Sequence, residues 1–207
     1  MLREVASRAE RALGPRHGKT LLAWNNLGAF FWERERLDEA EPLFEKALEG
    51  TLDKRGASHP DTLAMMRNLS ALLTYQGKFR EAEQLLRPAL DLQRVTLGDE
   101  HPETIQSIAN LGITLQRDER LAEALPLLRE ALQLSLASLG DGHPLVKNLI
   151  LTTVVCLQDL DKEAEAIALV EELLATTERS GQLEHAKLFR KLRAALEPSA
   201  PSGGGGR

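Results

Sequence analysis

The most constraining feature of this sequence is a short motif that returns at a fixed distance along the chain. His101–Pro102–Glu103–Thr104 recurs as His59–Pro60–Asp61–Thr62 and as His143–Pro144–Leu145–Val146, and in weaker form as His17–Gly18–Lys19–Thr20. Successive copies lie 42 residues apart, and one further step reaches His185. A fixed period of about 40 residues is typical of stacked helical repeats, in which no unit buries its apolar face without its neighbours. The motif therefore predicts an array of repeats.

The apolar residues within each unit predict two helices. In the first whole unit, Leu21, Trp24, Leu27 and Phe31 follow the three- and four-residue spacing of an amphipathic helix, and a second such stripe starts at Leu37. In each repeat a small residue occupies the same position of the first helix, and another occupies the same position of the second helix. Two helices that cross closely leave no room there for a larger side chain. We therefore expect three contacts between the paired helices: Gly28 with Ala40, Ser70 with Ala82, and Gly112 with Ala124.

The residues between units predict how one helix ends and the next begins. Gly98 and Gly140 follow apolar helix ends, where glycine tolerates a positive φ. Pro60, Pro102 and Pro144 are expected to open the next helix, where a missing N–H costs little. The histidine before each proline is expected to pack or hydrogen-bond within the turn. Metal binding is disfavoured, because neighbouring units stack about 10 Å apart, too far for two histidines to share one ion.

The period divides the chain into units. The predicted parts are the second helix of a truncated preceding repeat (1–14), repeat 1 (15–58), repeat 2 (59–100), repeat 3 (101–142), a divergent repeat 4 (143–181), a C-terminal capping helix (182–196) and a flexible tail (197–207).

Composition excludes several classes of function. A formal net charge of −5 argues against general affinity for nucleic acid or acidic membranes. Because no run of 18 apolar residues occurs and the N-terminus is charged and amphipathic, we expect a soluble, cytoplasmic protein. The single Cys156 excludes an internal disulfide framework and a multi-cysteine metal site. No cofactor is expected.

Several of these residues resemble the tetratricopeptide repeat. The likeness rests on Trp24–Asn25–Asn26–Leu27–Gly28, Asn68–Leu69–Ser70 and Asn110–Leu111–Gly112, with alanine at 40, 82 and 124 and again at 47, 89 and 131. The 42-residue period, with G-x-x-H-P-[DE]-T between units and A-E-P-L or A-E-Q-L in the second helix, is similar to the kinesin light chain subtype. The resemblance covers about residues 1–196 and implies an all-α, right-handed superhelical solenoid of antiparallel helix pairs.

Such a fold implies a groove lined by the first helix of each pair. Counted on the repeat, the groove positions are Asn25, Asn26, Ala29, Trp32, Glu33, Arg67, Asn68, Ala71, Thr74, Tyr75, Gln106, Asn110, Ile113, Gln116, Arg117, Asn148, Leu151, Thr152, Val155 and Asp159, with Arg190 and Arg193 as an extension. By resemblance, Asn26, Asn68 and Asn110 hold the family's peptide-clamping position, where an amide pairs with a ligand backbone. The predicted peptide-binding residues are Asn26, Arg67, Asn68, Tyr75, Asn110, Ile113, Arg117 and Thr152.

These residues predict a non-catalytic scaffold that binds a peptide segment of a partner, with cargo or adaptor recognition as the resemblance implies. Arg67, Arg117, Arg190 and Arg193 outnumber Glu33 and Asp159, so an acidic or carboxylate-bearing segment is favoured. An alternative is a self-associating or regulatory repeat region of a larger signalling protein, with a homo-oligomer formed through the apolar face of residues 2–13. A nucleotide-binding enzyme is disfavoured, because the P-loop-like residues 14–20 are one residue short and follow no apolar strand.

Overall fold

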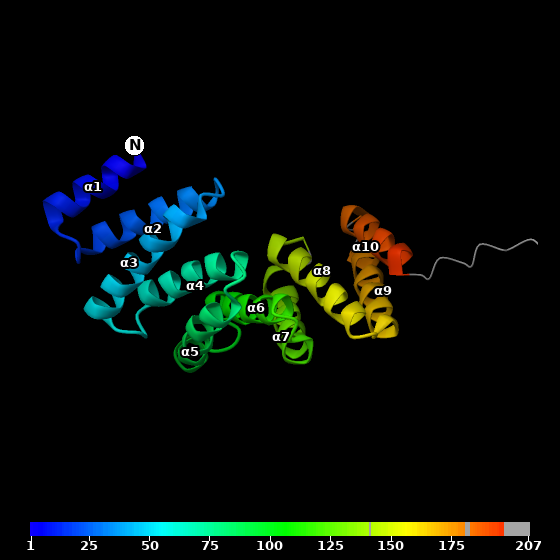
Figure 1. Ribbon diagram of the computed structural model, residues 1–207. Coiled ribbons are helices and arrows are strands. Elements are labelled where there is room, and N and C mark those ends of the chain that lie inside the picture. Colours follow the sequence, from blue (N-terminus) through cyan, green and yellow to red (C-terminus); the bar gives the residue numbers. More distant parts are fainter. Residues whose placement is uncertain (141, 181–182, 197–207) are drawn as a thin grey trace, which may run out of the picture. The chain divides into compact units, whose positions relative to one another are not determined.

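The computed structural model describes residues 1–140, 142–180 and 183–196, and within them all regular structure is α-helical. Figure 1 shows the helices in chain order. Their bounds are α1 (Leu2–Leu13), α2 (Gly18–Trp32), α3 (Leu37–Arg55), α4 (Pro60–Tyr75), α5 (Phe79–Leu97), α6 (Pro102–Arg117), α7 (Leu121–Leu139), α8 (Pro144–Asp159), α9 (Glu163–Ser180) and α10 (Leu183–Leu196). The expected all-α fold class is confirmed. The predicted tail, 197–207, lies outside the described residues.

The helices repeat with the period of the sequence. The helices α2, α4, α6 and α8, which we call the first helices, begin at residues 18, 60, 102 and 144. The second helices α3, α5, α7 and α9 begin at residues 37, 79, 121 and 163, so each series advances by 42 residues. A short turn joins the two helices of each pair, which makes them antiparallel neighbours.

The chain divides into two compact units, residues 1–127 and the part from residue 128 onward. In the first unit, each helix from α1 to α6 packs against the next, and the first helices α2, α4 and α6 also contact one another in turn. In the second unit, α9 packs against both α8 and α10.

The histidine of each motif caps a first helix. His17, His59, His101 and His143 are the N-caps of α2, α4, α6 and α8, and each Nδ1 accepts a hydrogen bond of 3.1–3.2 Å from the backbone N–H two residues later. This bond satisfies one of the N–H groups that a helix start leaves without a partner. The expected hydrogen-bonding role is therefore confirmed for these four histidines. The fifth histidine of the series falls inside the first turn of α10, and its side chain lies outside the described part.

The other turn residues also adopt their expected roles. Pro60, Pro102 and Pro144 are the first residues of α4, α6 and α8. Gly98 follows α5 with a φ of 84°, in the left-handed region that favours glycine. The sequence motif thus encodes a complete helix end and helix start at each junction.

Small residues allow close helix crossing in the core of the first unit. A Cβ placed on Gly28 of α2 would lie 3.0 Å from the Phe44 ring and 3.3 Å from the backbone oxygen of Ala40 in α3. Ala40 and Phe44 are almost completely buried, as are Ala82 and Leu86 in α5. The expected contact between Gly28 and Ala40 is confirmed, and the bulky Phe44 side chain fills the space that the glycine leaves.

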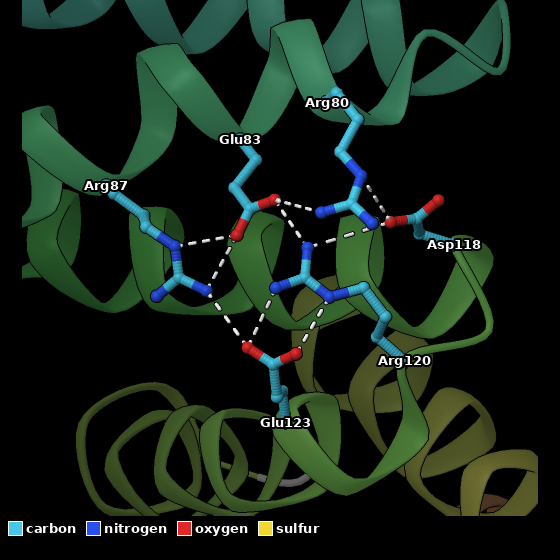
Figure 2. Close-up of polar contacts among 6 residues, drawn as sticks. All are labelled: Arg80, Glu83, Arg87, Asp118, Arg120 and Glu123. Atoms are coloured by element: carbon cyan, nitrogen blue, oxygen red, sulfur yellow. Dashed lines mark hydrogen bonds and ion pairs between the residues drawn. The ribbon is translucent and has the colours of Figure 1, made fainter.

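A network of six charged residues joins two successive second helices, α5 and α7 (Figure 2). Arg120, from the turn before α7, places Nη1 2.5 Å from Glu83 Oε2 of α5 and donates from Nε to Glu123 Oε1 at 2.8 Å. Arg87 of α5 contacts both carboxylates, at 2.7 Å for Glu83 and 3.3 Å for Glu123. Arg80 and Asp118 complete the network at 3.5 Å from each other.

The network changes the ionisation of its carboxylates. The hydrogen bond from Arg120 lowers the pKa of Glu83, with a smaller contribution from Arg87, and burial only partly opposes this. Arg120 likewise lowers the pKa of Glu123. Three arginines neutralise three carboxylates here, so this patch between the second helices has no charge to spare for a ligand.

Candidate functional site

The candidate site is a hollow of about 570 Å³ between the first helices α4 and α6, reached also by the end of α2. We call it the α4–α6 hollow. It is lined by Trp32, Arg67, Asn68, Ala71, Pro102, Glu103, Gln106 and Asn110. The three predicted binding residues Arg67, Asn68 and Asn110 therefore lie in one place, together with three further expected groove positions, Trp32, Ala71 and Gln106.

Arg67 is the cationic side chain of this hollow. It is half-buried, and its guanidinium forms no ion pair with any residue that the structure describes. Glu103 lies in the same lining and also has no ion pair there. Partial burial removes some of the water around the Arg67 guanidinium, and no described carboxylate pairs with it in exchange. A ligand carboxylate would provide the missing partner.

The asparagines at the predicted clamping position differ in their surroundings. Asn68 Nδ2 donates to Asn25 Oδ1 at 2.8 Å, which links α4 to α2. Asn110 Oδ1 accepts from Gln106 Nε2 at 3.1 Å, within α6. Asn26 is exposed and lies outside the α4–α6 hollow. The amide oxygen of Asn68 and the amide N–H₂ of Asn110 remain open to a ligand.

The remaining predicted residues lie outside the α4–α6 hollow. Tyr75 is 49% exposed, Ile113 is half-buried, and Thr152, in the second unit, donates its hydroxyl to the Asn148 backbone oxygen at 2.9 Å. Arg117 donates from Nη1 to the Thr74 backbone oxygen of α4 at 3.4 Å, so this arginine also connects α6 to α4.

Thr74 itself is not a groove residue. It is 7% exposed, and its Oγ1 lies 2.8 Å from Thr114 Oγ1 and 2.8 Å from the Ser70 backbone oxygen. The period placed it on the groove side, but its hydroxyl joins α4 to α6 in the interior.

A second hollow of about 460 Å³ lies next along the first helices, between α2, α4 and the end of α3. We call it the N-terminal hollow. Its charged and polar lining includes Lys19, Lys54 and Arg55, with Asp61 opposite. Arg55 pairs with Asp61 at 2.7 Å, whereas Lys19 and Lys54 have no ion-pair partner among the described residues. Asn25 lines this hollow too, so its hydrogen bond with Asn68 marks the border between the two hollows.

The two arginines expected to extend the groove are engaged by α9. Arg190 of α10 places Nη2 2.5 Å from Glu178 Oε1, and Arg193 places Nε 3.0 Å from Glu171 Oε1. Their charge is used to hold α10 on α9. These two arginines are therefore not free to pair with a ligand in the way expected from the sequence.

Pro102 and Glu103 also line the hollow, although neither is among the groove positions predicted from the sequence. Both stand at the start of α6. Their place one turn before Gln106 on the same helix was the available signal, since residues three or four apart share a face.

The P-loop-like segment does not have the structure that phosphate binding requires. A P-loop follows a β-strand, whereas residues 2–13 form the helix α1, which packs against α2. Ala6 of α1 is buried and Leu2 half-buried, while Val5 and Leu13 are exposed. Part of the apolar face expected to be open for self-association is thus covered by α2.

Cys156 of α8 is completely buried, and burial raises the pKa of its thiol. Within residues 1–140, 142–180 and 183–196, His, Cys, Asp and Glu side chains form no cluster suited to a metal ion. None of the described helices combines the length and the apolar character needed to cross a membrane.

Comparisons with known proteins agree with this architecture. A sequence profile described as Tetratricopeptide repeat matches residues 1–52, 19–94, 61–137 and 104–179. Kinesin light chain TPR-like repeats from Podosopora anserina are similar in two solved structures. One is 23% identical with a TM-score of 0.76, covering 87% of this chain and 85% of that chain, and the other is 21% identical with a TM-score of 0.73, covering 87% and 96%.

A third solved structure, BtubC (BKLC) from P. vanneervenii, is 16% identical with a TM-score of 0.56 and covers 100% of this chain and 92% of that chain. No curated protein matches the sequence significantly. The structural likenesses extend over nearly the whole chain and show a shared fold.

Proposed function

Because the chain belongs to the tetratricopeptide repeat family, whose repeats form scaffolds for protein–protein interaction, we propose that its first helices bind an acidic segment of a partner protein. Its repeats have the kinesin light chain-like form, and the corresponding role is recognition of a cargo or adaptor protein. The proposal includes the division into repeats predicted from the sequence: repeat 1 is 15–58, repeat 2 is 59–100, repeat 3 is 101–142 and repeat 4 is 143–181.

The observation that carries the proposal is the state of Arg67. It is half-buried in the α4–α6 hollow, next to Asn68 and Asn110, and has no carboxylate partner among the described residues. A carboxylate of the bound segment would pair with the guanidinium, and the two amides would hydrogen-bond the ligand backbone.

The neighbouring N-terminal hollow supports an acidic ligand. Lys19 and Lys54 line it without ion pairs to described residues, and the Asn25–Asn68 hydrogen bond joins one of its lining residues to one of the α4–α6 hollow. An extended segment crossing that pair would meet Arg67 on one side and two lysines on the other. The ligand we propose therefore carries acidic groups several residues apart.

The proposal is tested with labelled extended peptides in two matched sets, one containing Asp and Glu and the other Asn and Gln at the same positions. Anisotropy titration should show binding of acidic peptides to the wild type. The Arg67→Glu variant should bind about 10- to 150-fold more weakly, since a charge-assisted hydrogen bond contributes roughly 1.5–3 kcal/mol.

Arg8→Glu is the matched control, because Arg8 is exposed on α1 and lines neither hollow. It makes the same change in net charge and should leave the affinity nearly unchanged. Equal losses in the two variants would reduce the binding to diffuse charge attraction and refute the groove site.

A further inference from the structure

A further hollow lies in the second unit, between the second helices α7 and α9. It measures about 800 Å³, and we call it the α7–α9 hollow. Its lining comes from α7 and α9 alone: Arg129, Leu132, Gln133, Leu136, Ala137, Glu165, Ala168, Leu169, Glu172 and Leu173. On each helix these residues follow the three- and four-residue spacing of one helix face.

Three of the lining positions carry smaller or uncharged residues compared with the equivalent positions of the preceding units. Positions one and two periods earlier in the sequence provide the comparison. Gln133 stands where the two preceding units have Asp91 and Glu49, Ala137 where they have Val95 and Asp53, and Ala168 where they have Pro126 and Gln84. The acidic residues at the first two of these positions are thus absent here, and the apolar part of the lining consists of leucine and alanine.

The charged residues differ between the two ends of the hollow. At one end, Arg129 Nη2 lies 2.5 Å from Glu165 Oε2, so these two charges satisfy each other. Two turns along α9, Glu172 lines the same hollow, is exposed, and has no ion pair with any described residue. An occupant therefore meets an apolar floor with one uncompensated negative charge at its edge.

We propose that the α7–α9 hollow docks an amphipathic helix of a partner protein, with an apolar stripe on the floor and a lysine or arginine against Glu172. Two helices that present matched apolar stripes leave a trough between them, and a third helix fills such a trough by ridges-into-grooves packing. Recognition of an amphipathic helix in an apolar groove is a common mode of protein binding. This surface is separate from the proposed peptide groove of the first unit and does not depend on it.

The test uses a labelled helical peptide of about 14 residues, about four turns, with leucine at positions i, i+3, i+4 and i+7 and lysine on the flanks. A second peptide keeps the leucines and has glutamate flanks. By anisotropy titration, the lysine peptide should bind the wild type and the glutamate peptide should not. Ala137→Glu should weaken the lysine peptide about tenfold or more, because Ala137 is exposed in the free protein and the bound peptide would cover the new carboxylate with apolar side chains.

Charge reversal provides the second arm. Glu172→Lys should weaken the lysine peptide about tenfold or more and should allow the glutamate peptide to bind. Glu163→Lys is its matched control, since Glu163 is exposed on α9 and does not line the hollow. Val95→Glu is the control for Ala137→Glu, being the exposed residue at the same position one period earlier. Both controls should stay within about twofold of the wild type.

Thermal unfolding of every variant establishes that it is folded. Equal binding by wild type and Ala137→Glu would overturn the proposal, and so would losses of the same size in the matched controls. If Arg67→Glu abolished binding of the lysine peptide, the peptide would be occupying the first-helix groove, which would also overturn it. Failure of the acidic-peptide experiment would leave this test unaffected, because the two sites share no residue.

Discussion

One position of the second helices is buried in every repeat but carries a polar side chain. Thr51, Gln93, Ser135 and Thr177 occupy the same place in successive repeats, and all are 2% exposed or less. Thr51 satisfies its hydroxyl on the Ala47 backbone oxygen at 2.6 Å. Among the described residues, none accepts a hydrogen bond from Gln93 Nε2 and none donates one to its Oε1. A buried amide without partners destabilises the fold.

Replacing this amide should therefore stabilise the protein. We expect Gln93→Met, which has a similar length and no hydrogen-bonding requirement, to raise the free energy of unfolding by about 1–3 kcal/mol. Urea unfolding followed by circular dichroism measures the difference. Gln84→Met, at an exposed site on the same helix, should change stability by less than about 0.5 kcal/mol. A loss of stability in Gln93→Met would mean that the amide is bound inside the native fold.

At the scale of the helix, ion pairs between successive second-helix positions recur with the repeat. Arg3 pairs with Glu39, Arg87 with Glu123 and Arg129 with Glu165, each acidic residue lying 36 positions after its arginine. Between α3 and α5 the same two positions hold Glu45 and Glu81, which are like charges and both exposed. The series is therefore interrupted at one junction.

Glu45→Arg should complete the series. The new arginine would stand between Glu41 and Glu81, as Arg87 stands between Glu83 and Glu123. We expect a gain of about 0.2–1 kcal/mol, the usual value for an exposed pair, measured as a shift in the urea midpoint. Glu45→Gln removes the charge of Glu45 without adding a positive one, and should therefore gain less. If the arginine variant gained no more than the glutamine variant, the pair would be contributing nothing.

These elements also show what could be predicted from sequence. The period of His59, His101 and His143 placed the helix starts, because proline, glycine and capping residues act locally. The period also predicted Arg67, Asn68 and Asn110 as groove residues, and these three line one hollow. It could not show that long side chains bend towards a neighbouring helix, as Arg117 does towards the Thr74 oxygen. Such contacts depend on rotamers and helix spacing, which repeat position alone does not determine.

At the scale of the whole molecule, some charged side chains are ion-paired with described residues and others are not. The chain carries a net charge of −5, yet Lys19, Lys54 and Arg67 line the first-helix hollows without ion pairs to described residues. On the second helices, arginine and glutamate are matched in networks such as that of Figure 2. These three cations around the two hollows thus stay available for a ligand, whereas the network of Figure 2 pairs its charges with one another and holds successive repeats together.

This use of charge predicts how stability depends on pH. Hydrogen bonds from Arg120 lower the pKa values of Glu83 and Glu123, and Lys162 and Arg129 lower that of Glu165. In the unfolded chain a glutamate titrates near about 4.3, so between that value and the lower native values the unfolded state binds more protons. The carboxylates therefore contribute stability that is fully present above about pH 5 and is lost as pH falls through their native pKa values.

Glu83→Gln isolates this contribution. It should be less stable than the wild type at pH 7, because Arg120 and Arg87 lose their shared carboxylate. Between pH 5 and pH 3 its stability should fall less steeply, since one titrating group with a lowered pKa is gone. Glu49→Gln, at an exposed carboxylate of α3 with no ion pair to described residues, should follow the wild type. Urea unfolding at a series of pH values gives all three curves. Parallel curves for wild type and Glu83→Gln would show that the network at α5 and α7 does not set the acid stability of the array.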